Sequence, residues 1–338
     1  MSQSSALWIS EAEVVMLMDM RDAISALKKG LVAEAGGDAK NMLKTHVAWG
    51  DGASLHAIGA VFPKEGFAGT KTWAHTADGA TPLLILFDSN NGSLKAIIEA
   101  FALGQLRTAA ASGVATDRLA AKDADDFAIV GTGKQALAQV AAVMAVRPIK
   151  RIRVFGPNEE RRKRFGERVR GEFGIETIVS GSVSEAVAGA SIVTVATRAT
   201  DPIITSEMIA AGSHINAIGA IVRSRAEIAR DVLERCSQIV VDSVPAAQKL
   251  SREFIDYLGD ADTEGWNRVR SLAEVVAVDE SRDTSDDITL FKSLGMGISD
   301  LALGIELYHK VRAAGLGREF SHPERAMPRF RTAEQSSV

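Results

Sequence analysis

Cysteine is almost absent from this chain: Cys236 is the only one among 338 residues. A single cysteine cannot form a disulfide within the chain. Cys236 follows the helical stretch AEIARDVLER and precedes an apolar, strand-like stretch, and no cations are obviously arranged beside it to favour the thiolate form. We therefore expect a buried structural thiol rather than a reactive one.

An excess of positive charge and long apolar runs are also absent. The formal net charge is −4 at pH 7, with Lys and Arg scattered among Asp and Glu, so no basic stripe is available to neutralise a phosphate backbone. The start, MSQSSALWISEAEVV, lacks the basic and apolar regions of a signal peptide, and no run approaches the ~18 apolar residues of a membrane span. We expect a cytoplasmic protein that binds neither nucleic acid nor membranes.

The chain is longer than one hydrophobic core usually supports, so two domains are expected. Between residues 127 and 243, six short apolar runs alternate with helical patterns: DFAIVG, RIRVFG, IETIVS, SIVTVAT, SHINAIG and SQIVVDS. Strands that alternate with helices at this spacing pair in parallel through right-handed crossovers. The sequence thus predicts an α/β fold in which residues 123–299 form a Rossmann-type, doubly wound parallel sheet.

Residues 1–122 predict a second domain, a mixed or antiparallel sheet with helices at its ends. The stretches LLILFD and SLKAIIEA flank the sequence SNNG, a strong hairpin signal, and SLHAIGAVF and AGTKTWAH are further strand candidates. A helix over residues 102–121 leads into the parallel domain. Another, over residues 297–314 and capped by Gly315, is placed to return to the first domain. Residues 300–338 are assigned there, with a polar tail that is extended or disordered.

A glycine-rich turn follows the first strand of the predicted parallel sheet. Gly131, Gly133 and Ala136 give the pattern G-x-G-x-x-A at the start of a helix, with Thr132 and Gln135 between them. The first glycine permits the tight turn, the second lets the backbone approach a pyrophosphate, and the small third residue allows close packing of helix on strand. Taken alone, a turn of this kind can also bind nothing. Its place in a βαβ unit favours a dinucleotide, bound at the helix N-terminus.

The residues at the end of the second predicted strand indicate whether the dinucleotide is NAD or NADP. An NAD site normally has an acidic residue there, but this strand ends in GPN, with Asn158 followed by Arg161, Arg162 and Lys163. A 2′-phosphate would meet cations and no repelling anion, so NADP is favoured, with NAD as the alternative. The same arginines are also consistent with a solvated helix face.

Several motifs outside the glycine turn carry a resemblance to a known family. GQLRTAAASGVAT, AIVGTGKQA, GSHINAIGA, VVDSVPAAQ and ITLFKSLGMGISDLA occur in this order, and together they resemble the ornithine cyclodeaminase/mu-crystallin family over nearly the whole chain. The resemblance implies a homodimer in which a substrate and dimerisation domain, built from both chain ends, lies over a Rossmann domain. Family members include cyclodeaminases, ketimine or cyclic imine reductases, alanine dehydrogenases and a lens crystallin.

The resemblance also implies roles for individual residues. Arg107 looks like the arginine that grips the substrate α-carboxylate, which a planar guanidinium can do bidentately. Lys71 corresponds to the lysine near the reacting carbon, where partial burial would lower its pKa for proton transfer. Lys44 stands where the family usually has a second carboxylate-binding arginine, and a lysine there lacks the bidentate fork, which leaves its role open. Thr108 resembles a residue that touches the cofactor phosphate.

Other positions match the motifs around the cofactor. Asp242, Ser243 and Gln248 fit the pattern but are equally consistent with a structural role. The residues that we predict to contact the cofactor are Thr108, Gly131, Thr132, Gly133, Gln135, Ala136, Asn158, Arg161, Ala196, Thr197, Asn216, Lys292 and Ser293.

One departure from the family narrows the expected reaction. Cyclodeaminases carry an aspartate just after the NA-x-G turn, where a carboxylate can accept the proton from the attacking amine. This sequence has Ile221 at that point, which cannot take a proton. Ornithine cyclisation is therefore disfavoured.

The residues around the predicted substrate site are basic rather than acidic. Lys44, His56 and His75 are the predicted substrate-binding residues, and the only nearby acids, Asp51 and Glu65, fall in expected turns. A pocket for a cationic side chain would be expected to offer a carboxylate, so this one suits a substrate with a second carboxylate or a neutral side chain. Each histidine singly is also consistent with a structural or surface role, and none has metal-ligand spacing.

The sequence therefore predicts an NAD(P)H-dependent reductase of α-imino acids, or an amino-acid dehydrogenase running in reverse. Arg107 would hold the carboxylate and Lys71 would donate the proton. Two other interpretations stay open: an ammonia-eliminating cyclodeaminase that recycles its cofactor, and a non-catalytic, mu-crystallin-like protein that binds NADP.

Overall fold

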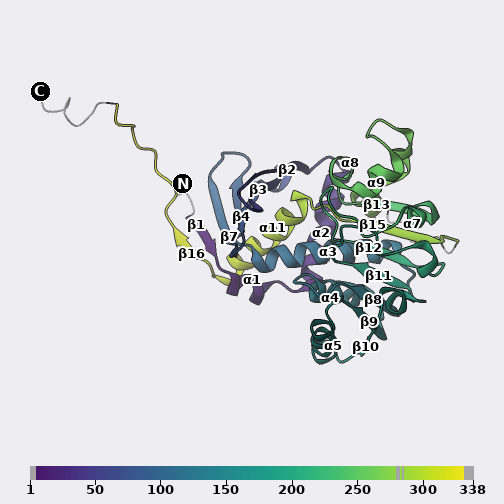
Figure 1. Cartoon of the computed structure of the whole chain (residues 1–338). Helices are drawn as coiled ribbons and strands as arrows, with labels where there is room; N and C mark the ends of the chain where they lie inside the picture. Colours follow the sequence, from purple (N-terminus) through teal and green to yellow (C-terminus); the bar gives the residue numbers. More distant parts are fainter. Residues whose placement is uncertain (1–4, 279–281, 284, 331–338) are drawn as a thin grey trace, which may run out of the picture.

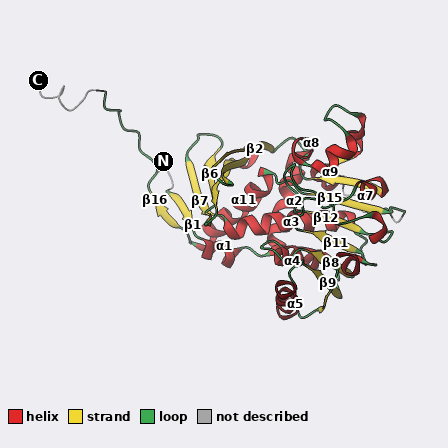
Figure 2. Cartoon of the chain, viewed as in Figure 1, coloured by secondary structure: helices red, strands yellow, loops and turns green. Residues whose placement is uncertain are grey.

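A computed structural model describes residues 5–278, 282–283 and 285–330. Two β-sheets lie at opposite ends of the molecule, with helices packed between them and around the second sheet (Figure 1). One sheet is entirely parallel and the other is mixed, so the predicted α/β class is confirmed. Figure 2 shows the helical layer between the two sheets in red.

The mixed sheet is built from the two ends of the chain. Its strand order is β16-β1-β7-β6-β4-β3-β2, with β5 paired to β4. The strands β1 and β7 pair in parallel and all other pairs are antiparallel. The bounds are β1 Ala6–Ile9, β2 Lys40–Trp49, β3 Ala53–Phe62, β4 Phe67–Thr76, β5 Gly79–Ala80, β6 Leu83–Asp88, β7 Leu94–Glu99 and β16 Arg318–Phe320. The predicted hairpin is confirmed, because β6 and β7 are neighbours joined at the SNNG turn.

The parallel sheet has the strand order β10-β9-β8-β11-β12-β15-β13-β14. Its strands are β8 Asp126–Val130, β9 Arg151–Phe155, β10 Glu176–Val179, β11 Ile192–Val195, β12 His214–Ala217, β13 Cys236–Val241, β14 Val269–Ser271 and β15 Ile288–Lys292. The six predicted strands are present, but the sheet has eight strands in the described residues, so the predicted number was too low. The sequence ITLFK, which was not predicted as a strand, forms β15, which is fully buried between β12 and β13.

Eleven α-helices occur in the described part of the chain. They are α1 Glu11–Leu17, α2 Met20–Ala35, α3 Phe101–Leu119, α4 Ala136–Val146, α5 Glu159–Phe173, α6 Val183–Val187, α7 Arg230–Arg235, α8 Val244–Leu250, α9 Arg252–Leu258, α10 Leu272–Ala277 and α11 Gly297–Ala314. Both helices predicted to connect the domains, α3 and α11, are confirmed, and α11 ends at Gly315 as expected. None of these helices is long and apolar enough to cross a membrane.

Two helices bring the sheets together. α3 contacts β12 and β15 of the parallel sheet, whereas α11 contacts β3, β4 and β6 of the mixed sheet. The start of α11 lies directly on β3, since a Cβ placed on Gly297 would be 1.8 Å from the carbonyl oxygen of Gly59. Only glycine permits this approach, and it carries the first turns of α11 into the space between the sheets.

One apolar core lies between the sheets and includes residues of α2, α3, α10 and α11. The two predicted domains therefore share their packing, and the division near residues 122 and 299 stays a prediction. Residues 321–330 form no helix or strand and extend away from the body (Figure 1). The remainder of the predicted tail, residues 331–338, lies outside the described residues.

The lone cysteine is buried, as the sequence predicts. Cys236 begins β13, and its thiol donates to the carbonyl oxygen of Val232 at 3.2 Å. Burial raises the pKa of the thiol to about 12. A thiol held in its protonated form is a poor nucleophile, which supports a structural role.

Candidate active site

The centre of the candidate site is a cluster of three charges, of which two are buried and the third, Arg107, is partly buried. Lys71 on β4, Arg107 on α3 and Asp300 on α11 meet where the two sheets approach each other. Lys71 Nζ lies 2.5 Å from Asp300 Oδ1, and Arg107 Nε lies 3.3 Å from the same oxygen. Asp300 is fully buried and Lys71 is 4% exposed. The two residues predicted to be catalytic thus converge on a single carboxylate.

The surroundings of Lys71 change its protonation. Burial lowers its pKa to about 8, the positive charge of Arg107 adds to this, and Asp300 opposes it. Its ammonium also lies 5.2 Å from the centre of the Trp73 ring. A lysine with a pKa near 8 holds a proton at neutral pH and releases it easily, as a general acid requires.

Asp300 has no role in the sequence prediction, although it is the residue that joins Lys71 and Arg107. A signal was available in the stretch GISDLALGI, where one acid interrupts the otherwise uncharged first half of the helix. A carboxylate in a buried helix face needs cationic partners. The sequence does not show which cations those are, because Lys71 is 229 residues away.

The predicted substrate-binding residues lie on one face of the β2-β3-β4 ladder. His56 is opposite His46 on β2 and opposite Trp73 on β4. Its ring stacks on Trp73 at a centroid distance of 4.7 Å, and its Nε2 lies 2.8 Å from Ser54 Oγ. Burial, followed by the charge of Lys44, lowers the pKa of His56 to about 4, so this imidazole is neutral at physiological pH.

Lys44 and His75 lie at different distances from the charged cluster. Lys44 is half-buried, with its Nζ 5.9 Å from the centre of the Trp73 ring. Burial and the positive charge of Arg107 lower the pKa of Lys44, and Asp300 opposes this. Lys44 therefore lies close enough to the cluster for both charges to act on it. His75 is exposed near the end of β4. The ladder thus brings Lys44, His56 and Lys71 together around Trp73 and leaves His75 at the edge.

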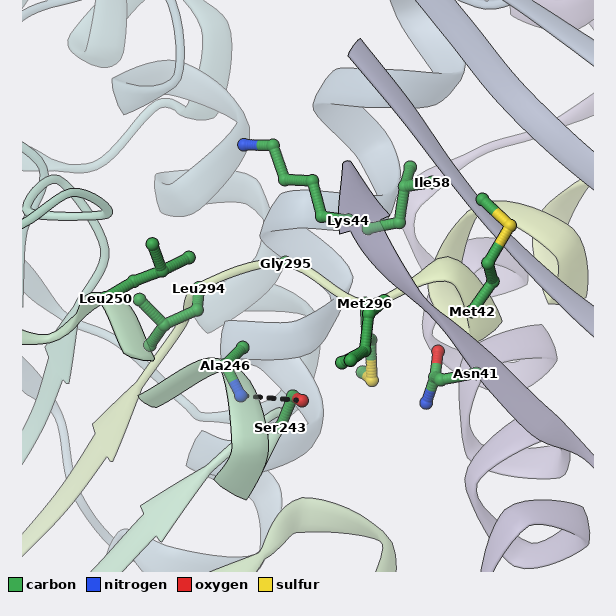
Figure 3. A pocket seen from close by; sticks show the side chains of 11 residues that line it. Asn41, Met42, Lys44, Ile58, Ser243, Ala246, Leu250, Leu294, Gly295 and Met296 are labelled. Atoms are coloured by element: carbon green, nitrogen blue, oxygen red, sulfur yellow. Dashed lines mark hydrogen bonds between the residues drawn. The ribbon is translucent and has the colours of Figure 1, made fainter. Parts of the chain in front are cut away.

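A cavity lies beside the cluster, between the mixed sheet and the segment that joins β15 to α11 (Figure 3). In Figure 3 the side chain of Lys44 extends past Gly295, away from Met42 and Asn41. Arg107 borders the same segment, because its Nη1 is 3.4 Å from the position of a Cβ on Gly295. The lining residues are Asn41, Met42, Leu43, Lys44, Ile58, Ser243, Ala246, Leu250, Leu294, Gly295 and Met296.

The glycine turn has the features of a pyrophosphate cradle. Gly131 has φ +112°, and a Cβ there would lie 2.4 Å from the carbonyl oxygen of Ala196, whereas a Cβ on Gly133 would meet nothing within 4 Å. The strand order reverses between β8 and β11, where Gly131 meets Ala196, and doubly wound sheets bind dinucleotides at this point. Gln135 Oε1 is buried without a partner in the described part of the chain. The turn therefore fits NAD(P), with open space over Gly133 for the phosphates.

The end of β9 is cationic, as predicted. The Arg162 guanidinium lies 5.5 Å from the centre of the Phe155 ring and donates to the carbonyl oxygen of Gly156 at 3.0 Å. Arg161 is exposed beside it. Asn158 caps α5 by accepting the N–H of Arg161 at 2.9 Å, so its side chain has a structural partner.

Other predicted cofactor contacts have partners within the protein. Asn216 Nδ2 lies 3.0 Å from Thr116 Oγ1, and Thr108 Oγ1 donates to Gly104 at 2.8 Å. Ser293 Oγ donates to Asp242 at 2.9 Å. These bonds occupy the side chains and hold the segments at the ends of β12 and β15, and the predicted cofactor contacts of these residues stay predictions.

Lys292 belongs to a buried charge cluster that the sequence does not reveal. Its Nζ lies 2.7 Å from Glu253 Oε2. Glu253 in turn accepts the N–H of Glu227 at 2.6 Å. Glu227 accepts both the N–H and the hydroxyl of Thr197, at 2.6 and 2.7 Å. This cluster connects α9 to the ends of β11, β12 and β15, where several of the predicted cofactor contacts lie.

Comparison with known proteins agrees with this geometry. Residues 6–315 match the ornithine cyclodeaminase/mu-crystallin family. This chain belongs to that family. It is 31% identical over 245 residues to a Delta(1)-pyrroline-2-carboxylate reductase of Bacillus thuringiensis subspecies konkukian, which spans 70% of this chain and 73% of that protein. It is 33% identical over 244 residues to the ketimine reductase mu-crystallin of Mus musculus, which spans 72% of each chain.

A solved structure from the same family extends the similarity to the fold. The Delta(1)-pyrroline-2-carboxylate reductase of Thermococcus litoralis, in complex with NADH and L-proline, matches with a TM-score of 0.86 and 29% identity. The match covers 93% of this chain and all of that one.

The turn after β12 differs from that expected of a cyclodeaminase in this family. Glu227 fixes the turn by accepting the N–H groups of Gly219 at 2.7 Å and Ala220 at 3.0 Å. The next residue is Ile221, which offers no carboxylate.

In the described residues, no group of three or more His, Cys, Asp and Glu side chains is placed to hold a metal ion.

Proposed function

We propose that this chain is an NAD(P)H-dependent reductase of α-imino acids, which converts the C=N bond of its substrate into the C–N bond of an amino acid. The observation that carries the proposal is the convergence of Lys71 and Arg107 on one buried carboxylate beside the cavity between the sheets. Membership of a family with relatives named pyrroline-2-carboxylate reductase and ketimine reductase supports the same class of reaction.

Each charged group has a distinct part in the proposed mechanism. Arg107 binds the substrate α-carboxylate through its guanidinium, which fixes the imine carbon in one orientation. Lys71 holds a proton at Nζ and gives it to the imine nitrogen, then regains one from solvent. NAD(P)H, when bound at the glycine turn, supplies the hydride and its two electrons to the imine carbon. Lys71 and Asp300 are buried, and their separation from water strengthens these charge interactions.

Turnover distinguishes this proposal from its two rivals. The protein is incubated with NADPH or NADH and a panel of 2-oxo acids with methylamine or ammonia, together with cyclic imino acids. Cofactor oxidation that requires both amine and oxo acid, or the cyclic imine, is the expected result. Ornithine converted to proline without net cofactor oxidation would identify a cyclodeaminase. Cofactor binding without any turnover would identify a binding protein.

We infer that NADP is preferred over NAD. Arg162 is held at the end of β9 by Phe155 and Gly156, and the three residues directly after the strand, Gly-Pro-Asn, include no acid to repel a 2′-phosphate. The double variant Arg161→Ala, Arg162→Ala is expected to lower the ratio of kcat/KM for NADPH to that for NADH by about 10-fold or more. Lys163→Ala is the matched control, because Lys163 pairs with Glu159. A wild-type preference for NADH would contradict the inference.

We also propose that the protein is a homodimer that uses the outer face of the β2-β3 hairpin. Val47 and Leu55 are directly opposite each other, and Trp49 lies on the same face. These side chains are 61%, 46% and 48% exposed, and together they form an apolar patch on the edge strand β2 and its neighbour β3. Sedimentation analysis is expected to give a dimer for the wild type and a monomer for Val47→Asp with Leu55→Asp. Val15→Asp, an exposed position on α1, is the control.

A further inference from the structure

We propose that the cavity beside the cluster binds a second carboxylate of the substrate on Lys44, so that the preferred substrates are imines of 2-oxo dicarboxylic acids. This inference rests on the proposed reductase function and adds the class of substrate to it. It starts from the difference between Lys44 and the other two cations of the site.

Lys71 and Arg107 share Asp300 as an anionic partner, and Lys44 does not. In the described part of the chain no carboxylate lies within 4.0 Å of Lys44 Nζ. Asp242, the other buried acid near Arg107, is already occupied: its oxygens accept the N–H groups of Leu294 and Gly295 at 2.7 to 2.9 Å. The charge of Asp300 acts on Lys44 without a direct contact, and a half-buried ammonium that touches no carboxylate favours the binding of an anion.

The cavity itself contains one charge. Apart from Lys44, its described lining is apolar or consists of polar side chains with partners. Asn41 Oδ1 accepts the N–H of Ile298 at 2.9 Å and its amide donates to Glu34. Ser243 Oγ accepts the N–H of Ala246 at 3.4 Å. Lys44 is thus the charged group in this lining that is available to a ligand, and the apolar walls suit the methylene groups of a short side chain.

His56 provides a second donor beside Lys44. Its Nδ1 is buried and has no partner in the described part of the chain, while Nε2 is occupied by Ser54. If Nε2 accepts the serine proton, the neutral imidazole carries its own proton on Nδ1 and can donate it. An ammonium and an imidazole N–H together form a carboxylate site, whereas the described lining of the cavity includes no carboxylate that could bind a cationic side chain such as that of ornithine.

Two cations of the site lie near the β15–α11 segment. Arg107 borders Gly295 with Nη1, and Lys44 extends past Gly295 in Figure 3. With the α-carboxylate on Arg107, a side-chain carboxylate one or two methylene groups away would point into the cavity towards Lys44.

The test compares matched substrates that differ in the second carboxylate. Imines formed from oxaloacetate and 2-oxoglutarate are compared with imines formed from 2-oxobutyrate and 2-oxopentanoate, with methylamine as the amine. We expect the wild type to prefer the dicarboxylates in kcat/KM. Lys44→Met is expected to lower the ratio of dicarboxylate to monocarboxylate kcat/KM by about 10-fold or more, mainly through KM. Lys44→Arg is expected to retain the preference, and Lys40→Met, at an exposed position on the same strand, is the control.

Each outcome has a separate meaning. If Lys44→Met lowers kcat/KM for dicarboxylate and monocarboxylate imines by the same factor, Lys44 binds the α-carboxylate instead and the inference is wrong. If the wild type reduces monocarboxylate imines equally well, the reductase function stands and the inference is wrong. If no imine is reduced, the proposed function fails, and calorimetry of 2-oxoglutarate and 2-oxopentanoate binding still decides whether Lys44 selects the second carboxylate.

Discussion

Replacing Asp300 with asparagine tests the charge arrangement at the centre of the candidate site. The substitution keeps the shape of the side chain and removes the negative charge that Lys71 and Arg107 share. In the described residues no other carboxylate pairs with Lys71. The cluster then contains one buried and one partly buried cation, with Lys44 beside them, and no anion of its own.

The size of the effect follows from the distances. Two unit charges 2.5 Å apart interact by about 7 kcal/mol at an effective dielectric constant of about 20, and the cost of removing both from water offsets much of this. Breaking a buried pair by neutralising one partner typically costs about 3–5 kcal/mol of stability. A hydrogen bond to a charged group contributes about 1.5–3 kcal/mol, which corresponds to about 1–2 pKa units. We therefore expect the pKa of Lys71 to fall from about 8 by about 1–2 units in the variant.

The pH dependence of imine reduction measures this shift. Proton donation requires the Lys71 ammonium, so kcat/KM is expected to fall as pH rises through about 8 in the wild type. In Asp300→Asn the same decline is expected about 1–2 pH units lower, with the Kd for NADPH little changed because Asp300 is on α11 rather than at the glycine turn. Asp283→Asn, an exposed aspartate outside the site, is the control. A decline that stays near pH 8 in the variant would refute the assignment of Lys71 as proton donor under the influence of Asp300.

Three further predictions concern the cofactor turn, the stability of the fold and the thiol. Gly133→Ala is expected to leave the Tm nearly unchanged and to weaken NADPH binding, since its Cβ meets no protein atom. Gly131→Ala is expected to lower both the Tm and the affinity for NADPH, because its Cβ would collide with Ala196. Equal Tm values for the two variants would contradict this. Because the pKa of Lys71 is lowered in the folded state, the free energy of unfolding should rise with pH between about 8 and 10.5. Denaturant titrations should show a smaller rise in Lys71→Met. Cys236 should react with a thiol reagent only after unfolding, and rapid labelling of the native protein would show that it is accessible.

Local patterns predicted the features that short stretches of sequence determine. The hairpin at SNNG, the glycine turn after β8 and the helices α3 and α11 depend on residues that are neighbours in sequence, and all are present. β15 was missed because a five-residue apolar run before a helix does not reveal that it inserts between β12 and β13. Its position depends on pairing with strands that precede it by tens of residues, which no local pattern encodes.

The same distinction applies to the site. Lys71 and Arg107 were predicted as site residues through a family resemblance, and in the structure both side chains lie next to the same oxygen of Asp300. Asp300 and the pair of Lys292 with Glu253 were not predicted, because a buried ion pair depends on which distant segments share one space. Lys292 pairs with Glu253, and its predicted contact with the cofactor stays a prediction. The sequence does not show whether a lysine at the end of a strand faces a ligand or a buried acid.

The site also depends on how closely the two sheets approach. Lys71 belongs to the mixed sheet, Arg107 to a helix that contacts the parallel sheet, and Asp300 to a helix whose first residue, Gly297, lies against β3. A larger residue at 297 would push α11 away from β3 and withdraw the carboxylate from both cations. Since Asp300 raises and Arg107 lowers the pKa of Lys71, such a movement would change the proton-donating strength of the lysine before any substrate binds. The close contact between α11 and β3 is therefore a requirement of the proposed chemistry as well as of the fold.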